Sequence, residues 1–331
     1  MNFKFLKNNF FKESISMYFV LGVSQKLLLP ALLDRDESDT KVIFTIYNIE
    51  DEFPAKIIKI RPKGVFQSIF LILSLHVFFA KLFFYKKIKI FSPHLLNYLC
   101  NKVYYSKKAK VSFYYLFDGT LNYGKFYGDK QPYKSYQKKQ RYKSLLLLHV
   151  YKKTSGLIID KNLVNVKGML APKGVIVEKI NFIAPIVELP ILTGLDNEIG
   201  HNVLVLEPPF ESVNEREIFE IKLLELLGEL IVGSQVIVKP HPSKDEVAIS
   251  LSKIENAGFE TKIVFSKTPA EIVFFEEKCS TAISSFSSAL LMIKSLCEEA
   301  TVISIDCGKL ISEDSNGSVR NVMQEIGVVF K

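Results

Sequence analysis

Three short polar segments of the sequence each follow a run of apolar residues that is typical of a buried strand. They are Asp118-Gly119-Thr120, Lys239-Pro240-His241-Pro242 and Ser284-Ser285-Phe286-Ser287-Ser288. In a parallel α/β sheet, ligands bind at the carboxyl ends of the strands. The residues of these three segments are therefore the first candidates for chemistry.

His241 is the candidate with the most constrained backbone. It follows the predicted strand Gln235–Lys239 and stands between two prolines, whose rings fix the backbone on either side. An imidazole held in this way can donate a proton or a hydrogen bond to a phosphate oxygen, and Lys239 adds a positive charge nearby. The alternative is a rigid loop with an exposed histidine. The remaining histidines are predicted to be structural or superficial: His76, His94, His149 and His201.

Asp118 follows the predicted strand Val111–Phe117, and Gly119 lets the chain turn sharply after it. A carboxylate at such a strand end can accept a proton from a substrate hydroxyl. The alternative is an ordinary Asp-Gly turn with no chemical role.

The serines from Ser284 to Ser288 lie between a predicted strand and a predicted helix. Hydroxyls and free backbone amides at a helix N-terminus form an anion site. Serine is also a frequent helix cap, and the two roles are compatible. Glu271 follows Thr268-Pro269-Ala270 at the start of another predicted helix. It either caps that helix or accepts hydrogen bonds from a ribose diol, as acids do in nucleotide sites.

Predicted strands alternate with predicted helices along the chain. In the first half the strands are Ser16–Leu21, Lys41–Tyr47, Lys86–Phe91 and Val111–Phe117, with a turn at residues 22–25 and helices at Lys26–Leu33, Val65–Phe84 and His94–Val103. In the second half the strands are Asn202–Leu206, Gln235–Lys239, Lys262–Phe265, Thr281–Ser284 and Thr301–Ile305, and the helices are Glu215–Leu230, Asp245–Ala257, a short one opened by Pro269, and Ser288–Cys297. This rhythm predicts parallel sheets that are covered on both faces.

The length of 331 residues corresponds to about two domains. The polar stretch Gly194–His201 is the predicted boundary, which gives an N-terminal domain of residues 1–197 and a C-terminal domain of residues 198–331. The predicted fold class is α/β, with two Rossmann-like domains that face each other across a cleft.

The composition is that of a globular protein. Hydrophobic residues make up 48% and charged residues 24%, which excludes disordered, collagen-like and low-complexity classes. Four cysteines, Cys100, Cys279, Cys297 and Cys307, form no CxxC pair and fit no zinc spacing. They indicate a reducing compartment and no structural metal. No small-residue cleavage site follows the basic, aromatic start, so no signal peptide is expected.

Two segments bear on membranes. The apolar run Val65–Phe84 is interrupted by polar residues and is predicted to be a buried or half-buried helix rather than a span; a helix on the membrane surface is the alternative. The segment Asn122–Lys153 has nine Lys and Arg against one Asp, with six tyrosines interleaved. It favours an anionic partner such as lipid head groups or an acidic glycan, with a solvated loop and helix face as the alternative. No nucleic-acid-binding motif accompanies it.

Four motifs occur in a fixed order: Asp-Gly-Thr-x-x-Tyr at Asp118–Tyr123, Lys-Pro-His-Pro at Lys239–Pro242, Pro-x-Glu at Pro269–Glu271, and the double serines. In order and spacing they resemble the bacterial sialyltransferases of the GT-B fold, which comprise glycosyltransferase families 52, 38 and 80. The start of the chain, where Gly-Val-Ser-Gln follows the strand Ser16–Leu21, is similar to the start of these enzymes.

The resemblance implies a role for each matching residue. Asp118 is implied to be the general base on the acceptor hydroxyl, and His241 to contact the donor phosphate and assist the departure of CMP. Glu271 is implied to hold the cytidine ribose. The other implied acceptor-side residues are Ser24, Gln25, Gly119, Thr120 and Tyr123; the other implied donor-binding residues are Lys239, Pro242 and either Ser284-Ser285 or Ser287-Ser288. These enzymes usually have two acids before the glycine, and here the first is Phe117.

The resemblance thus predicts an inverting sialyltransferase that moves sialic acid from CMP-sialic acid to a hydroxyl of a lipooligosaccharide or capsule. No metal and no cofactor is expected, because CMP is already a good leaving group. The expected partners are the nucleotide-sugar donor, a lipid-linked or surface glycan, and an anionic membrane surface through residues 122–153; a homodimer stays open. The expected location is cytoplasmic, peripheral to the inner face of the cell membrane. The alternatives are a GT-B transferase with a CMP-Kdo or UDP-sugar donor, and a non-catalytic, membrane-associated partner of glycan assembly.

Overall fold

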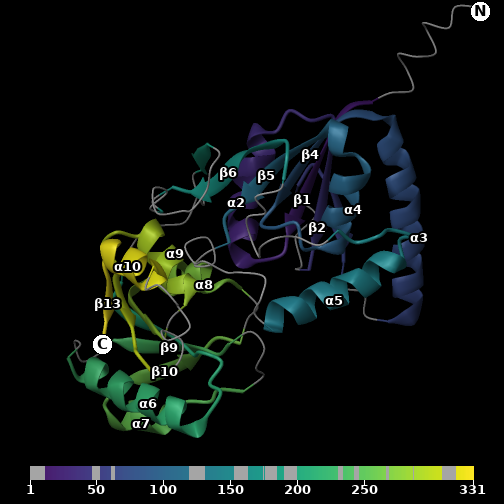
Figure 1. Ribbon diagram of the computed structural model, residues 1–331. Coiled ribbons are helices and arrows are strands. Elements are labelled where there is room, and N and C mark those ends of the chain that lie inside the picture. The colour runs from purple at the N-terminus through teal and green to yellow at the C-terminus, as the bar shows by residue number, and fades with distance from the viewer. Residues whose placement is uncertain are drawn as a thin grey trace, which may run out of the picture. The chain divides into compact units, whose positions relative to one another are not determined.

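The computed structural model divides the chain into two compact units, each built on one parallel sheet (Figure 1). It describes residues 12–46, 53–60, 64–118, 131–152, 163–173, 175, 185–189, 200–229, 234–241, 246–265, 268–285, 287–307 and 318–331. The first sheet has seven strands and the second has six.

The strands of the first unit lie in the order β3-β2-β1-β4-β5-β6-β7, and all neighbours are parallel. Their bounds are β1 Lys12–Val20, β2 Thr40–Thr45, β3 Lys56–Lys59, β4 Tyr85–Ser92, β5 Val111–Leu116, β6 Val166–Pro172 and β7 Ile186–Leu189. The first strand, β1, lies inside the sheet; the chain then runs out to the edge strand β3 and crosses back to β4 on the other side of β1. The strand order therefore reverses between β1 and β4, the place where doubly wound sheets bind ligands.

Strand β1 lies inside this sheet, between β2 and β4, because its side chains are apolar on both faces. Met17, Tyr18, Phe19 and Val20 are consecutive and fully buried. Consecutive side chains point to opposite faces of a strand, so both faces of the sheet are covered. The predicted strand Ser16–Leu21 is confirmed in place, although β1 begins at Lys12.

The helices of the first unit are α2 Val23–Arg35, α3 Val65–Lys81, the 3-10 turn η1 Leu82–Phe84, α4 Tyr98–Ser106, the 3-10 turn η2 Lys108–Lys110 and α5 Gln131–Leu145. The predicted turn at residues 22–25 is wrong, because α2 already begins at Val23. The predicted helix His94–Val103 also begins later. Asn97 caps α4, its side chain accepting hydrogen bonds from the backbone N–H groups of Leu99 and Cys100, and an N-cap residue stands outside the helix that it opens.

The prediction that Val65–Phe84 is a buried or half-buried helix is only partly right. The helix exists, but within α3 only Leu75 is buried. Several of its large apolar side chains are exposed instead, among them Phe66 and Phe70. Figure 1 shows α3 on the outer side of the first unit. Sequence periodicity detects an apolar helix, but it does not reveal which neighbour covers it.

The second unit repeats the strand order of the first. Its sheet runs β10-β9-β8-β11-β12-β13, all parallel. The strands are β8 Asn202–Leu206, β9 Gln235–Lys239, β10 Glu260–Ile263, β11 Cys279–Ser284, β12 Thr301–Ser304 and β13 Val328–Phe330; the helices are α6 Val213–Gly228, α7 Leu251–Asn256, α8 Ala270–Glu276, α9 Ser288–Leu296 and α10 Ser318–Glu325. The order reverses between β8 and β11, so a second ligand edge is expected there.

Most predicted elements of the second unit match the structure. The strands β8 and β9 have the predicted bounds. The predicted helix Asp245–Ala257 is shorter, since α7 begins at Leu251. Pro269 precedes α8 as its N-cap rather than opening it. The predicted boundary after residue 197 falls in residues 190–199, outside the described residues, and stays a prediction.

Candidate functional site

In the first unit the structure brings Gln25 and Asp118 together at the carboxyl edge of the sheet. Gln25 lies in the first turn of α2, directly after β1, and Asp118 follows β5. The Gln25 Nε2 group donates hydrogen bonds of 2.8 Å to Asp118 Oδ1 and of 2.8 Å to the backbone oxygen of Phe117. Gln25 is fully buried, whereas Asp118 is half-buried. The amide therefore orients a carboxylate that solvent and ligands can still reach.

Gly22 leaves the space that this pair needs. A Cβ atom at position 22 would lie 2.7 Å from Gln25 Oε1 and 3.2 Å from Asp118 Oδ1. A separation of 2.7 Å is shorter than van der Waals contact, so any side chain at this position would displace Gln25. The glycine of the Gly-Val-Ser-Gln segment thus has a steric reason for its presence.

His94 lies beside this pair, which the sequence did not predict. It stands in the loop between β4 and α4, at the carboxyl end of the strand next to β5. Burial lowers the pKa of His94, and the negative charge of Asp118 acts in the opposite direction. Within the part of the chain that the structure describes, its buried Nδ1 atom has no hydrogen-bond partner. A neutral imidazole with an unused ring nitrogen is suited to bind a hydroxyl.

Phe117 occupies the position before Asp118 as a core residue. Its side chain is fully buried, and its backbone N–H donates a hydrogen bond of 3.0 Å to the oxygen of Leu170 on β6. The aromatic ring therefore supports the sheet, and the site depends on Asp118 for its acid.

The remaining acceptor-side residues cannot be placed in this group. Gly119, Thr120 and Tyr123 lie outside the described residues. Ser24 belongs to α2, but its side chain is not among those described. Their predicted roles stay predictions.

In the second unit, Lys239 and Glu271 are two buried ionisable side chains, each of which influences the pKa of the other. Lys239 ends β9 with 5% of its surface exposed, and Glu271 in the first turn of α8 has 4% exposed. Burial raises the pKa of Glu271 to about 7, and the positive charge of Lys239 partly offsets this rise. Burial likewise lowers the pKa of Lys239, against the charge of Glu271. A buried carboxyl group whose pKa is raised in this way is a candidate ligand-binding group.

His241 is half-buried two residues beyond the end of β9, as the sequence predicts. It lies at the same edge of the second sheet as the end of β11, since β9, β8 and β11 are successive neighbours. Pro242 lies outside the described residues.

The serines after β11 divide into different roles. Ser284 Oγ donates a hydrogen bond of 2.8 Å to the backbone oxygen of Leu206, which ties β11 to β8. Ser287 caps α9 by accepting a hydrogen bond of 3.2 Å from the N–H of Ala289. Ser285 is buried, with only 2% of its surface exposed. Its Oγ atom has no hydrogen-bond partner among the described residues. Ser288 is the exposed first residue of α9.

These contacts bear on which serine pair, Ser284-Ser285 or Ser287-Ser288, could bind a phosphate. The Ser284 hydroxyl is committed to the sheet, while Ser285 has a buried hydroxyl without a partner next to the N-terminus of α9. A buried polar atom normally has a partner, and a ligand can supply it. The N-terminal end of a helix attracts anions. Ser285 and the start of α9 therefore fit an anionic ligand best.

Glu207 is a buried acid at the end of β8 that the sequence analysis missed. Its Oε1 atom accepts hydrogen bonds of 2.8 Å from the backbone N–H groups of Ala248 and Ile249. Burial raises its pKa, and these two hydrogen bonds oppose the rise. Glu207 thus anchors the chain that follows the His241 loop. The position directly after the buried run Asn202–Leu206 was the available signal.

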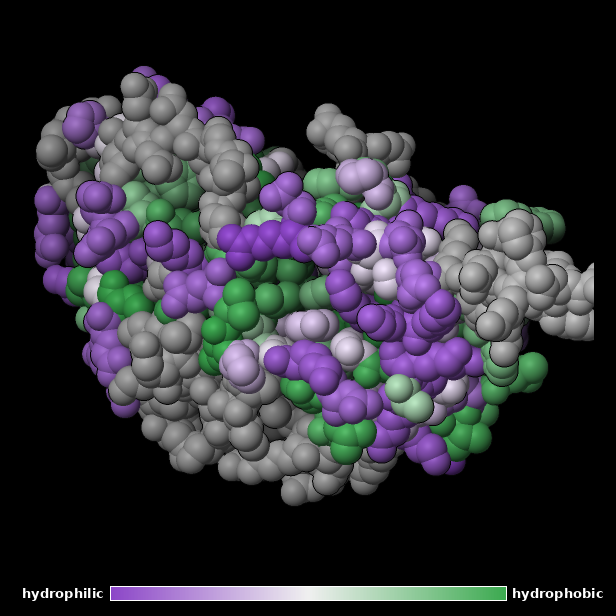
Figure 2. Space-filling model, turned by 90° about the horizontal axis from the view of Figure 1, so that it is seen from above, coloured by the Kyte–Doolittle hydropathy of each residue, from purple (hydrophilic) through white to green (hydrophobic). Residues whose placement is uncertain are grey.

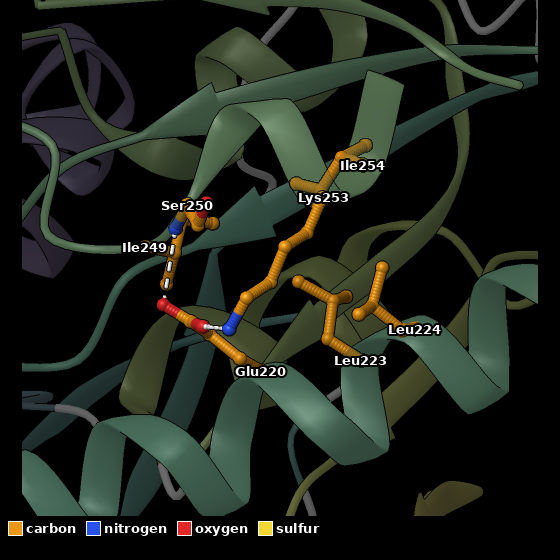
Figure 3. A pocket seen from close by; sticks show the side chains of 7 residues that line it. All are labelled: Glu220, Leu223, Leu224, Ile249, Ser250, Lys253 and Ile254. Atoms are coloured by element: carbon orange, nitrogen blue, oxygen red, sulfur yellow. Dashed lines mark hydrogen bonds and ion pairs between the residues drawn. The ribbon is translucent and has the colours of Figure 1, made fainter. Parts of the chain in front are cut away.

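A pocket of the second unit lies between α6 and the segment that leads into α7. It is lined by Glu220, Leu223, Leu224, Ile249, Ser250, Lys253 and Ile254 (Figure 3). Glu220 bridges its two sides, accepting hydrogen bonds from Ser250 N at 3.0 Å and from Lys253 Nζ at 2.5 Å. These contacts join α6 to α7 and give the pocket a structural role.

Among the described residues, no group of three His, Cys, Asp or Glu side chains is placed to hold a metal ion. The predicted absence of a metal requirement stays a prediction. The four cysteines are free thiols, and three of them are buried.

Comparison with known proteins shows similarity at the level of structure only. No protein-family profile matches the chain, and no curated protein matches it. A crystal structure of an α/β-galactoside α-2,3-sialyltransferase from Photobacterium phosphoreum is similar over 96% of this chain and 98% of its own, with a TM-score of 0.53 at 12% identity. Residues 113–497 of a sialyltransferase from Photobacterium damselae, described as its GT-B domain, are similar over 96% of this chain and 99% of their own, with a TM-score of 0.53 at 11% identity.

A UDP-GlcNAc 2-epimerase from Methanocaldococcus jannaschii is also similar, with a TM-score of 0.49 at 9% identity over 96% of this chain and 88% of its own. The two sialyltransferase structures match both sheets of this chain over nearly its whole length. The chain therefore has the α/β, two-domain GT-B fold that its sequence predicts.

Proposed function

We propose that the protein is an inverting sialyltransferase that moves sialic acid from CMP-sialic acid to a hydroxyl of a bacterial surface glycan. The observation that carries this proposal is the Gln25–Asp118 pair. It places an oriented carboxylate at the carboxyl edge of the first sheet, within the Asp-Gly-Thr-x-x-Tyr motif that resembles the bacterial sialyltransferases. The fold shared with two sialyltransferase structures supports the same assignment.

Asp118 is the proposed general base. It takes the proton of the acceptor hydroxyl while the hydroxyl oxygen attacks C2 of the sialic acid. Gln25 orients the carboxylate through Oδ1. The neutral ring of His94 offers a hydrogen bond to the same acceptor. A base held in position raises the rate, because it need not be ordered when the reaction occurs.

The second unit is proposed to bind CMP. Glu271 accepts hydrogen bonds from the ribose diol, while Ser285, the start of α9 and His241 bind the phosphate. As the bond between C2 and the phosphate oxygen breaks, the electron pair stays on CMP, and donors aimed at the phosphate stabilise this charge. One displacement from the opposite side inverts the configuration at C2, by the logic of inverting glycoside hydrolysis.

The donor is tested by incubating the purified protein separately with CMP-sialic acid, CMP-Kdo and UDP-sugars, and by following nucleotide release. Slow release of CMP from CMP-sialic acid alone, lost in His241→Ala, supports the proposal. Release from another donor keeps a GT-B transferase and changes its substrate. If the protein neither binds nor cleaves any donor, the proposal fails, and the non-catalytic alternative is the one to test next. Equal CMP release with and without a metal chelator is expected.

The role of Glu271 is tested with two nucleotides that differ only in the ribose. Glu271→Gln is expected to weaken binding of CMP by about tenfold, the effect of one hydrogen bond to a charged group. Binding of 2′,3′-dideoxy-CMP, which lacks the diol, should hardly change. Equal losses for both nucleotides would assign Glu271 a structural role.

A further inference from the structure

The helix α3 presents a continuous apolar face on its outer side. Phe66 is 90% exposed, Phe70 74% and Leu73 60%. Ile69 and Val77 are 51% and 56% exposed. Each of these five residues lies three or four positions from at least one other member of the set. Side chains at such intervals share one face of a helix. This set of five residues is called the α3 face below.

The opposite side of α3 is attached to the first unit. Leu75 is buried, and the ring of Phe78 packs edge-on against Phe44 of β2, with ring centroids 5.5 Å apart. The helix therefore has a fixed inner side and an uncovered outer side. The first unit buries the inner side of α3 but leaves the α3 face exposed. A continuous exposed apolar surface is typical of a binding site for a partner outside the unit.

A second exposed apolar segment adjoins α3. It begins at Leu145, the last residue of α5, and continues with Leu146, Leu148 and Val150. These four residues are 58%, 57%, 88% and 74% exposed. His76 on α3 makes a hydrogen bond of 3.1 Å with the backbone oxygen of Leu146. Figure 1 shows the end of α5 reaching α3. Figure 2 shows that hydrophobic residues interrupt the hydrophilic surface of the molecule in several places.

The part of the sequence that contains α3 is strongly basic. Residues 53–159 contain twenty-one Lys and Arg against two Asp, a net charge of +19, although the whole chain has only +8. Two of these cations pack on aromatic rings near the C-terminal end of α3, beyond the α3 face itself. Lys107 Nζ is 3.6 Å from the ring centre of the exposed Phe83, and Lys102 Nζ is 4.7 Å from that of Phe79. An exposed apolar helix face on a strongly basic unit matches the two layers of an anionic membrane surface.

We propose that the α3 face lies in the interface of an anionic lipid bilayer, with its apolar side chains among the acyl chains and the neighbouring lysines at the head groups. The basic segment 122–153 predicts contact with an anionic membrane, and the α3 face adds an apolar anchor to that contact. The described part of this segment includes α5 and the leucines after it. The twenty residues Val65–Phe84 are long and apolar enough to cross a membrane. The packing of Leu75 and Phe78 keeps them along the unit instead.

A second copy of the chain is a less suitable binding partner for the α3 face than an anionic bilayer. A symmetric dimer through α3 would bring two segments of net charge +19 together, and like charges in an interface are repulsive. Anionic lipid removes that repulsion and supplies the apolar layer as well.

Vesicle binding tests the proposal without any need for transferase activity. The wild-type protein is sedimented with vesicles of phosphatidylcholine, and with vesicles of equal parts phosphatidylcholine and phosphatidylglycerol. Binding to the anionic vesicles, reduced by salt, is expected. The double variant Phe66→Ser/Phe70→Ser should bind at least about tenfold more weakly, because two exposed aromatic side chains no longer enter the bilayer.

The matched control is Ile221→Ser/Phe265→Ser, which removes two exposed apolar residues of the second unit, 57% and 56% exposed. It should bind like the wild type. Equal binding of the α3 variant and the wild type overturns the proposal. So does a wild-type dimer that binds no vesicles and that the α3 variant converts to a monomer. Both variants replace exposed residues, and thermal unfolding confirms that each is folded.

Discussion

Gln25 and Asp118 are 93 positions apart in the chain, yet a hydrogen bond of 2.8 Å joins them at the carboxyl edge of the first sheet. The contact depends on the strand order. Strand β1 leads directly into α2, which carries Gln25, while β5 leads into Asp118, and only β4 lies between the two strands. A doubly wound sheet therefore assembles a site from the beginning and the middle of a domain.

Gln25→Ala is expected to lower the rate of sialyl transfer by about 10- to 100-fold, because the base loses its fixed orientation. Binding of CMP should stay unchanged, since the donor residues lie in the second unit. Gln140→Ala is the control. It removes another buried glutamine, which accepts a hydrogen bond of 3.2 Å from the N–H of Tyr98. A loss of transfer in both variants alike would show that Gln25 acts through stability alone.

Gly22→Ala is expected to lower transfer to a similar extent, because its methyl group would meet Gln25 Oε1 at 2.7 Å. Gly64→Ala is a matched control, since Gly64 also precedes a helix and a Cβ there has no atom within 4 Å. Initial rates at saturating donor and acceptor measure the difference. If Gly22→Ala transfers at the wild-type rate, the spacing around Gln25 does not limit catalysis.

Ser285→Ala and Ser284→Ala are expected to differ. Ser285 has a buried hydroxyl without a partner in the described chain, so its loss should weaken CMP binding by about tenfold and leave stability unchanged. Ser284→Ala breaks the hydrogen bond to the oxygen of Leu206 and should lower the free energy of unfolding by about 1–2 kcal/mol. Calorimetry with CMP and urea unfolding measure the two effects. The reverse pattern would assign the phosphate to Ser284.

Glu271 gives the stability of the protein a pH dependence. Burial raises its pKa from 4.5 to about 7 in the folded chain. Between these values the folded chain keeps a proton that the unfolded chain has lost, so the free energy of unfolding falls as the pH rises. Above about pH 7 this contribution is constant. Glu271→Gln should remove this decline, on the order of 1–3 kcal/mol.

Urea unfolding of both proteins at about pH 5 and about pH 8 measures this difference. All other titrating groups are common to the two proteins, so the comparison isolates Glu271. Parallel pH profiles would show that Glu271 is ionised in the folded state throughout this range.

Much of the fold could be predicted from the sequence because the strands are short, apolar and followed by turn residues. The strands β8 and β9 have the predicted bounds, and Asp118 and His241 follow strands as expected. His94 was missed because the apolar pattern after it continues as a helix, and the start of α4 is fixed by the capping side chain of Asn97. Because α4 begins after Asn97, His94 lies in the loop beside Asp118 and not in the predicted helix.

The environment of each site residue could not be predicted from the sequence. The same Ser-Ser-x-Ser-Ser run contains a sheet contact, a helix cap and a hydroxyl without a partner, and only the register of β11 decides which serine takes which role. For α3, composition predicts an apolar helix, but exposure depends on how many of its faces the sheet can cover.

The strand order also governs how each sheet must assemble. In both units the first strand in sequence lies inside the sheet, and its second neighbour is far away in sequence. Lys12 of β1 pairs with Tyr85 of β4, and Asn202 of β8 pairs with Cys279 of β11. Bringing two distant strands together costs conformational entropy before their contacts stabilise the sheet. Proteins rich in such distant pairings therefore fold slowly. Until β4 and β11 arrive, each central strand keeps one edge unpaired, and unpaired edges favour aggregation. The arrangement that builds both ligand edges thus makes newly synthesised chains dependent on rapid completion of their sheets.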